Sequence, residues 1–209
     1  MKIFLDFDRT LYDLDAFHEV ARDVFETHGV PREKYNESKA SFSHGSGKAG
    51  GLYTPEEHDA VFEKMSVKIV PSPATCIRGV AREGKQFVFD DVFDFLQKIE
   101  KHQKIILTFG DAEYQRFKIS GAGLDSFIDD IIVTNGEKWE EIQKAMRPDE
   151  SAIFIDDHRD YFLQPRGNQP VYGIHLVRKD NARNFCDGCR APYHASDLQE
   201  VSEIIKNLE

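Results

Sequence analysis

The sequence predicts an α/β protein built on a parallel sheet, with a block of helices inserted after the first strand. From about residue 86 onward, short apolar strands alternate with amphipathic helices, a pattern typical of a parallel sheet covered on both faces. Residues 13–85 show helical periodicity without a convincing strand. We therefore predict a core formed by residues 1–12 and 86–209 and an inserted helical domain at residues 13–85.

The composition excludes several classes of function. The 209 residues include 27 Lys and Arg against 37 Asp and Glu, a formal net charge of −10. This balance lacks the basic footprint of a nucleic-acid-binding protein. No apolar run approaches the roughly 18 residues of a membrane span, and the chain begins with a strand pattern instead of a signal peptide. With only three cysteines, these features predict a cytoplasmic protein without nucleic-acid or membrane partners.

The first elements are a strand and two helices. Residues 2–5 form an apolar run, and residues 14–25 then carry apolar side chains every three or four positions. Gly29 ends this helix. A weaker helical segment is expected at residues 32–42.

A glycine- and serine-rich loop at residues 43–51 divides the helical block. It does not match the nucleotide-binding P-loop, because Phe42 occupies the position of the first glycine. The next helix is expected to start with Thr54 as its N-cap. Pro71 and Pro73 are expected to end this region.

The remaining elements alternate regularly between strand and helix. Each expected strand is a short apolar run, and each expected helix has an apolar face. The last helix is predicted to start with Ser196 as its N-cap and Gln199 three residues on. The other expected helices are residues 90–101, 111–120 and 137–146, and the expected strands are residues 104–108, 130–134, 151–155 and 171–177.

Polar side chains follow the expected strands where each strand ends. In an open parallel sheet these carboxyl ends form the ligand-binding edge. Neighbouring carboxylates there would repel each other unless they shared a cation, and hard oxygen ligands suit Mg²⁺. The side chains concerned are Asp6 and Asp8 after the first strand, Thr108 at the end of the second, Lys138 after the third, and Asp156 and Asp157 after the fourth.

The turn after the second strand suits an anion. Thr108 is followed by Phe109 and Gly110 before the next helix begins. A hydroxyl and the free backbone N–H groups of a helix N-terminus therefore come together at this turn.

With these motifs in this order, the sequence resembles the haloacid dehalogenase superfamily, and within it the phosphatases with a helical cap inserted just after the first strand. The resemblance covers residues 2–10 and 86–178, whereas the cap matches in length and helicity. It implies a Rossmann-like sheet and a Mg²⁺-dependent transfer of a phosphoryl group to an aspartate. The four matching motifs are Asp6-Phe7-Asp8-Arg9-Thr10, Thr108 after Ile-Ile-Leu, Lys138, and Asp156-Asp157 after Ile-Phe-Ile.

The resemblance also implies a role for each residue. Asp6 would be the nucleophile that forms an aspartyl-phosphate, and Asp8 the general acid and base. Thr108 and the Phe109 amide would hold the phosphoryl oxygens, and Lys138 would offset their charge. The implied Mg²⁺ ligands are Asp6, the Asp8 backbone carbonyl, Asp157 and Asp156, and the implied substrate-binding residues are Phe7, Phe109 and Gly110.

Two positions depart from the family pattern or compete with it. Asp156 takes the place of a usual glycine, and Asp160 is three residues beyond Asp157 instead of four, so we rank Asp157 first, Asp156 second and Asp160 third as metal ligands. Lys118 competes with Lys138, but it lies several residues into a helix, about 10 Å from its N-terminus.

The predicted function is a Mg²⁺-dependent phosphatase that acts on a small phosphorylated metabolite. A phosphomutase of the same family and a non-catalytic regulatory protein are the alternatives. A dehalogenase is disfavoured, because family members of that kind do without the acid at Asp8. Cys186 and Cys189 form a Cys-x-x-Cys pair near His175 and His194, which leaves a zinc site or two reduced thiols as alternatives. The sequence does not predict the substrate or the oligomeric state.

Overall fold

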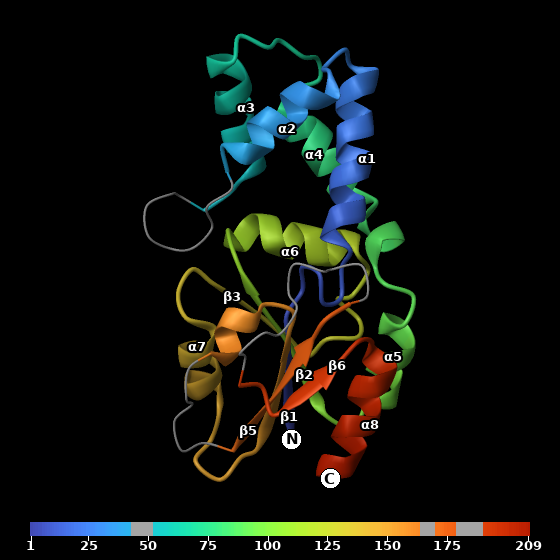
Figure 1. Ribbon diagram of the computed structural model, residues 1–209, viewed down its shortest axis with the longest axis vertical. Helices are drawn as coiled ribbons and strands as arrows, with labels where there is room; N and C mark the ends of the chain where they lie inside the picture. Colours follow the sequence, from blue (N-terminus) through green and yellow to red (C-terminus); the bar gives the residue numbers. More distant parts are fainter. Residues whose placement is uncertain (43–51, 164–169, 179–189) are drawn as a thin grey trace. The chain divides into compact units, whose positions relative to one another are not determined.

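The computed structural model (Figure 1) describes residues 1–42, 52–163, 170–178 and 190–209. The loop at residues 43–51 and the cysteines at 186 and 189 lie outside the described residues. The chain divides into two compact units. The sheet unit comprises Met1–Asp13, Val88–Phe109 and Leu124–Glu209, and the helical unit comprises Leu14–Phe87 and Gly110–Gly123. That these units act as catalytic core and cap stays a prediction.

The sheet unit contains a six-stranded sheet, which confirms the predicted α/β class with a Rossmann-like parallel core. All strand pairs are parallel, and the order is β3-β2-β1-β4-β5-β6. The last strand was not predicted, because its three residues are too few to show a pattern. The strands are β1 (Lys2–Leu5), β2 (Gln103–Phe109), β3 (Asp130–Thr134), β4 (Ala152–Asp156), β5 (Val171–Leu176) and β6 (Tyr193–Ala195).

The strand order places a topological switch point between β1 and β4. The chain passes from β1 to β2 and β3 on one side, and then returns to the other side as β4. Leu5 pairs with both Ile106 and Ile155, and the Asp6 amide donates to the Ile155 carbonyl at 2.9 Å. Ligands of open α/β sheets bind at such a point, beyond the carboxyl ends of the strands.

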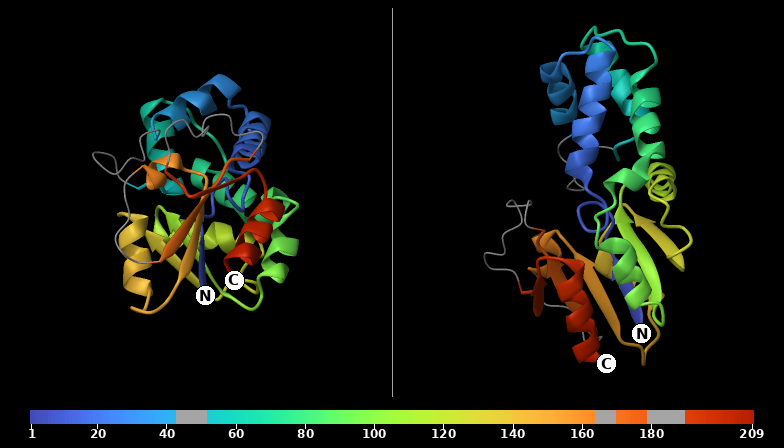
Figure 2. Two further views of the ribbon diagram at one scale, coloured as in Figure 1. Left: turned by 60° about the horizontal axis from the view of Figure 1, so that its bottom comes forward. Right: turned by 90° about the vertical axis from the view of Figure 1, so that its right-hand side faces the viewer.

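Helices cover both faces of the sheet (Figure 2). Successive residues of β1 are buried on both faces, as expected for a central parallel strand. One face carries α7 (Lys138–Ala145), whose Ile142 packs into a core with Phe4 and Phe154. The other face carries α5 (Val92–Lys98) and α8 (Leu198–Leu208), and a short 3₁₀ helix, η2 (Arg159–Phe162), follows β4.

The C-terminal helix α8 starts one residue later than predicted. Asp197, not Ser196, is its N-cap, and its carboxylate accepts a hydrogen bond from the Glu200 amide at 2.8 Å. The Glu200 carboxylate in turn accepts from the Ser196 amide at 2.7 Å. An aspartate is as good a cap as a serine, so the sequence allowed both registers.

The helical unit contains one helix that the sequence analysis missed. Pro73 was expected to end the helical region, but it occupies the first position of α4, because Ser72 is an N-cap whose hydroxyl accepts from the Thr75 amide at 3.3 Å. The predicted cap Thr54 is confirmed. The helices are α1 (Leu14–Thr27), α2 (Arg32–Ala40), α3 (Pro55–Lys64), α4 (Pro73–Arg82) and α6 (Ala112–Gly121), with the 3₁₀ helix η1 (Gly84–Phe87). Within the described ranges, no helix has both the length and the apolar character needed to cross a membrane.

Two glycines allow α6 to pack closely against the rest of the helical unit. A Cβ atom on Gly121 would lie 2.1 Å from the Ala81 carbonyl oxygen, and one on Gly84 would lie 2.9 Å from the Gly121 carbonyl carbon. Both distances are shorter than any real contact, so the backbones can approach only without side chains at these positions.

A buried histidine lies at the centre of the helical unit. The ring of His58 stacks with Phe25 and Tyr35 and packs at a tilt against Phe62. Its Nε2 lies 2.8 Å from the Ser38 hydroxyl and its Nδ1 lies 3.0 Å from the Tyr53 hydroxyl. Burial lowers the pKa of His58 to about 4, so the ring is neutral at neutral pH.

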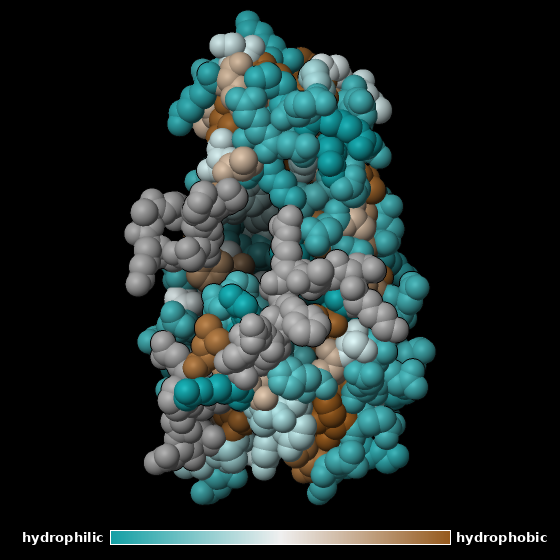
Figure 3. Space-filling view, viewed as in Figure 1, coloured by the Kyte–Doolittle hydropathy of each residue, from teal (hydrophilic) through white to brown (hydrophobic). Residues whose placement is uncertain are grey.

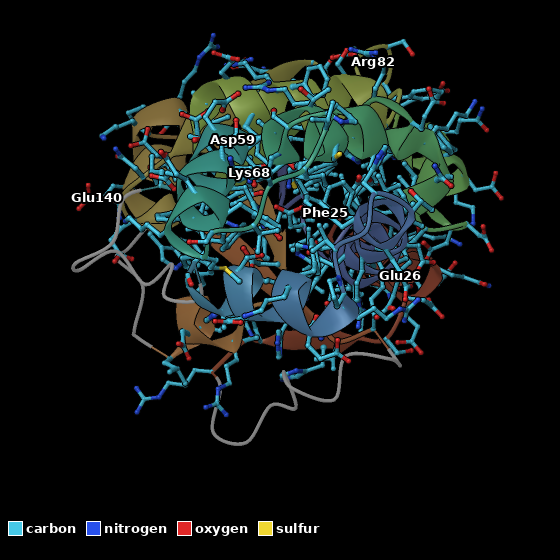
Figure 4. All side chains as sticks on the ribbon, turned by 90° about the horizontal axis from the view of Figure 1, so that it is seen from above. Phe25, Glu26, Asp59, Lys68, Arg82 and Glu140 are labelled. Atoms are coloured by element: carbon cyan, nitrogen blue, oxygen red, sulfur yellow. The ribbon has the colours of Figure 1, made fainter. Side chains whose placement is uncertain are left out.

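The helices carry apolar side chains on their inner faces and mainly hydrophilic side chains on their outer faces. Phe25 is buried on the side of α1 that faces the other helices, and the next residue, Glu26, is exposed on its outer side (Figure 4). The outer surfaces of α1 and α2 are mainly hydrophilic (Figure 3). This pattern is that of an amphipathic helix packed on one face.

We expect acid to destabilise the helical unit through His58. Its pKa of about 4 in the folded protein lies below the unfolded value of 6.5. The contribution of neutral His58 to the free energy of unfolding is therefore complete above pH 6.5. It is lost as the pH falls toward 4, and about 2 kcal/mol has been lost by pH 5. Thermal unfolding of the wild type and of His58→Gln between pH 4.5 and 8 would measure this. The variant should lose most of the pH dependence, and equal pH dependence in both proteins would contradict the expectation.

Candidate active site

Three buried carboxylates meet at the carboxyl ends of β1 and β4. Asp6 directly follows β1, Asp156 is the last residue of β4, and Asp157 follows it. Carboxylate oxygens from the three residues lie within 4.8 Å of one another, and the residues are 5 %, 0 % and 7 % exposed. Among the residues that the structure describes, this is the only such group of acidic, histidine or cysteine side chains. We refer to these three residues as the carboxylate cluster.

Lys138, the first residue of α7, places an ammonium group against the carboxylate cluster. Its Nζ lies 2.5 Å from Asp6 Oδ1 and 2.7 Å from Asp156 Oδ2. The ring centroid of Tyr161 is 4.9 Å from the same nitrogen, a distance that allows a cation–π contact. The structure thus brings Lys138 to Asp6, whereas the competing Lys118 lies on α6 in the helical unit.

Burial sets the protonation of this group. It raises the pKa of Asp6 to about 7, although Lys138 opposes the shift. Burial and the neighbouring Asp6 raise the pKa of Asp157 to about 8. Burial disfavours the charged form of Lys138, but Asp156 and Asp6 outweigh it and raise the lysine pKa above its usual range. With all four groups ionised, the three carboxylates and the Lys138 ammonium carry a net charge of −2.

The carboxylate cluster fits a hard divalent cation. Its donors are all carboxylate oxygens, which Mg²⁺ prefers. A net negative charge in a buried position is costly unless a cation neutralises it. Asp6, Asp156 and Asp157 are therefore the residues that could hold Mg²⁺.

The other two predicted acids lie outside the carboxylate cluster. Asp8 is half-buried, and its charge contributes to the raised pKa of Asp6. Asp160 is on η2 with 60 % of its side chain exposed, 3.6 Å from Arg159 Nε. Asp160 is not part of the carboxylate cluster, and the ranking of the metal ligands stays a prediction.

Backbone and hydroxyl groups orient the carboxylate cluster. The Thr10 hydroxyl donates to Asp6 Oδ2 at 3.3 Å, and the His158 amide donates to Asp156 Oδ1 at 2.7 Å. His175, on β5, has its Nε2 3.0 Å from the Asp157 carbonyl oxygen. The sequence analysis gave neither Thr10 nor His175 a role here. The Thr in Asp-x-Asp-x-Thr was a usable signal for Thr10, whereas His175 depends on the pairing of β4 with β5.

The predicted phosphate-binding residues lie just after β1, at the end of β2 and in the turn after β2. Thr108 is buried on β2, two positions after Ile106, which pairs with Leu5. Phe109 is the last residue of β2. Gly110 has φ of +144°, and a Cβ there would lie 2.8 Å from the Gln115 side chain, so this turn requires glycine. The Phe7 side chain is fully buried, which leaves its backbone for any contact with a substrate.

Fold and site together define a class of protein. A parallel α/β sheet carries, at its topological switch point, a buried aspartate that is held by a lysine beside two further acids. Such a centre can bind a divalent cation and present an oriented carboxylate to a ligand.

Solved structures show which known fold this is. No family model matches the chain, and no curated protein matches it in sequence. The magnesium-bound HAD-hydrolase YfnB from Bacillus subtilis is similar, with a TM-score of 0.69, 16 % identity and 98 % of each chain covered. An L-2-haloacid dehalogenase from Xanthobacter autotrophicus gives a TM-score of 0.67 at 14 % identity, covering 99 % of this chain and 98 % of that one. A HAD phosphatase from Thermococcus onnurineus gives 0.61 at 13 % identity, with 98 % of each chain covered.

The chain therefore has the fold of the haloacid dehalogenase-like hydrolases. The resemblance deduced from the motifs is confirmed at the level of the fold. Because proteins with this fold include both phosphatases and dehalogenases, the fold alone does not assign the reaction.

Proposed function

We propose that this protein is a Mg²⁺-dependent phosphatase of the haloacid dehalogenase superfamily, which acts in the cytoplasm on a small phosphorylated metabolite. The observation that carries the proposal is the buried carboxylate cluster with Lys138 at the ends of β1 and β4. This arrangement combines an oriented carboxylate nucleophile with a place for a divalent cation. The acidic surface does not prevent phosphate binding, since the cation and Lys138 determine the local charge.

Asp6 and Asp8 divide the chemistry. One Asp6 oxygen forms a bond to phosphorus as the bond from phosphorus to the substrate oxygen breaks, and Asp8 gives its proton to the leaving alcohol. Asp8 then takes a proton from water, which attacks the aspartyl-phosphate and releases phosphate and free Asp6. When bound, Mg²⁺ would neutralise charge on the phosphoryl oxygens.

The surrounding residues orient Asp6 and neutralise the charge of the phosphoryl group. Lys138 holds Asp6 Oδ1 and would balance the charge that the phosphoryl group brings. Thr108, with the backbone of Phe109 and Gly110, would hold the phosphoryl oxygens. Because phosphoryl transfer has a loose transition state, positioning and charge neutralisation supply most of the catalysis.

A panel of substrates tests the proposal against its alternatives. Phosphate release from small phosphomonoesters would be measured with Mg²⁺ and with EDTA, beside halide release from L-2-haloacids. Metal-dependent phosphate release without halide release is expected. Halide release would establish a dehalogenase, interconversion of phosphorylated isomers a phosphomutase, and no turnover of any substrate would favour a regulatory protein.

We also expect the affinity for Mg²⁺ to rise with pH. Asp6 and Asp157, with pKa values of about 7 and 8 in the metal-free protein, must lose their protons to bind a cation. The affinity should therefore increase about tenfold or more from pH 6 to pH 8, with release of protons. Isothermal titration calorimetry in two buffers of different ionisation enthalpy measures both quantities.

Two variants provide the matched comparison for this titration. Asp157→Asn should lose most of the Mg²⁺ affinity, whereas Asp160→Asn should retain it, because Asp160 lies outside the carboxylate cluster. An affinity that is independent of pH, or equal losses in both variants, would contradict the assignment of ligands.

A further inference from the structure

Arg178, two residues beyond β5, binds the loop that follows the first acidic motif. Its Nε and Nη2 donate hydrogen bonds to the Thr10 carbonyl oxygen at 3.1 and 2.8 Å. Only 11 % of its side chain is exposed. The planar guanidinium thus donates two hydrogen bonds to one backbone oxygen. A lysine ammonium does not reproduce this two-donor geometry.

The guanidinium itself is fixed from two other sides. Its Nη1 donates to Asp91 Oδ2 at 2.9 Å, and its carbon lies 3.9 Å from the ring centroid of Phe89. The same Asp91 oxygen accepts from the Leu198 amide at the start of α8, at 2.9 Å. Arg178 is therefore a rigid anchor, held by the sheet unit and pointed at Thr10.

Thr10 in turn holds the carboxylate of Asp6. Its hydroxyl donates to Asp6 Oδ2, and Lys138 donates to Asp6 Oδ1, so that each carboxylate oxygen has a donor that limits its rotation. The Thr10 contact, at 3.3 Å, is longer than usual for a hydroxyl donor. A small displacement of Thr10 would break it.

The loop that carries Thr10 is a tight turn closed by its own backbone hydrogen bonds. Arg9 has φ of +65°, a conformation that residues other than glycine rarely adopt. The Leu11 amide turns back to the Phe7 carbonyl at 2.9 Å. Arg178 adds two contacts to this turn from outside it, both at the Thr10 carbonyl oxygen.

We propose that Arg178 is a positioning residue for the reaction, which holds the carboxylate of Asp6 in its attacking orientation through Thr10. The proposal rests on the proposed function of Asp6 as nucleophile. Arg178 does not act on the substrate; it keeps the loop, and hence the hydroxyl donor, in place. A misorientation of the attacking oxygen by a fraction of an ångström lowers the share of reactive geometries and therefore kcat.

A mutant cycle with Thr10 distinguishes positioning from a merely structural role. Arg178→Met should lower kcat about 10- to 100-fold and change KM less, and Arg178→Lys should recover part of the loss. In a Thr10→Val background, Arg178→Met should lower kcat by a further factor of less than about three. The hydroxyl through which Arg178 acts on Asp6 has already been removed in that background. Arg147→Met, at an exposed arginine of the same unit, is the matched control.

The outcomes separate this proposal from the proposed function. If the wild type releases phosphate but the effects of Arg178→Met and Thr10→Val multiply independently, the positioning role is overturned. If the wild type and Asp6→Asn both release none, the proposed function fails, and crystal structures of wild type and Arg178→Met decide the positioning. The Thr10 hydroxyl should then lie beyond hydrogen-bond distance of Asp6 in the variant, and an unchanged contact would overturn the proposal.

Discussion

Asp6→Asn is expected to lower Mg²⁺-dependent phosphate release at least about 10⁴-fold. The amide has the size of the carboxylate but lacks the charge and nucleophilicity needed to attack phosphorus. It should not unfold the protein, because burial already disfavours the charged form of this residue and raises its pKa to about 7. At pH 8 in EDTA the variant should melt at or above the wild-type temperature, since a buried charge has been removed.

Initial rates of phosphate release, with melting temperatures of the same samples, measure this effect. Asp149→Asn, at an exposed aspartate of the sheet unit, is the control and should keep wild-type activity. Asp8→Asn should lose activity as well, because protonation of the leaving alcohol requires that acid. Activity within tenfold of wild type in Asp6→Asn would disprove the assignment of the nucleophile.

Much of the fold and the carboxylate cluster could be predicted, because both depend on local patterns. Apolar runs at β1 and β4 end in aspartates, and the carboxyl ends of parallel strands meet at one edge of a sheet. That rule was sufficient to place Asp6 beside Asp156 and Asp157 without knowledge of the strand order. The choice of Lys138 needed one further fact, that a helix N-terminus follows β3 after a short turn.

The features that were missed depend on tertiary contacts or on ambiguous local signals. Three residues are too few to identify β6, and Pro73 is compatible with the start of a helix as well as with the end of one. The grip of Arg178 on Thr10 joins residues 168 positions apart in the chain, so no spacing within the sequence could indicate it. Substrate specificity is a similar case, because it depends on side chains that no shared motif identifies.

Lys138→Met is expected to have the largest effect on stability. The lysine ammonium is bonded to two buried carboxylates, at 2.5 and 2.7 Å, and its loss leaves Asp6 and Asp156 without their cation. Removing one partner of a buried ionic group typically costs about 3–5 kcal/mol. Turnover should fall by about 10² to 10³ as well, since the phosphoryl charge loses a neutralising group.

The pH dependence of this loss gives a further check of its cause. Without Lys138 the pKa of Asp6 should rise above its present value of about 7. When the pKa of an acid is raised in the folded state, the folded protein becomes less stable as the pH rises toward that pKa. The loss of stability caused by Lys138→Met should therefore be larger at pH 8 than at pH 6. Protonation of the acids limits the cost at the lower pH.

Urea unfolding in EDTA at both pH values measures the free energy of unfolding. Lys144→Met is the matched control, because Lys144 lies on the same helix but is 65 % exposed and pairs with Glu141 at the surface, a contact worth at most about 1 kcal/mol. Saturating Mg²⁺ should restore part of the stability of Lys138→Met, because the cation would replace the missing positive charge. If Lys138→Met unfolds like Lys144→Met at pH 8, the ammonium does not neutralise the carboxylate cluster, and the charge argument for a metal centre loses its basis.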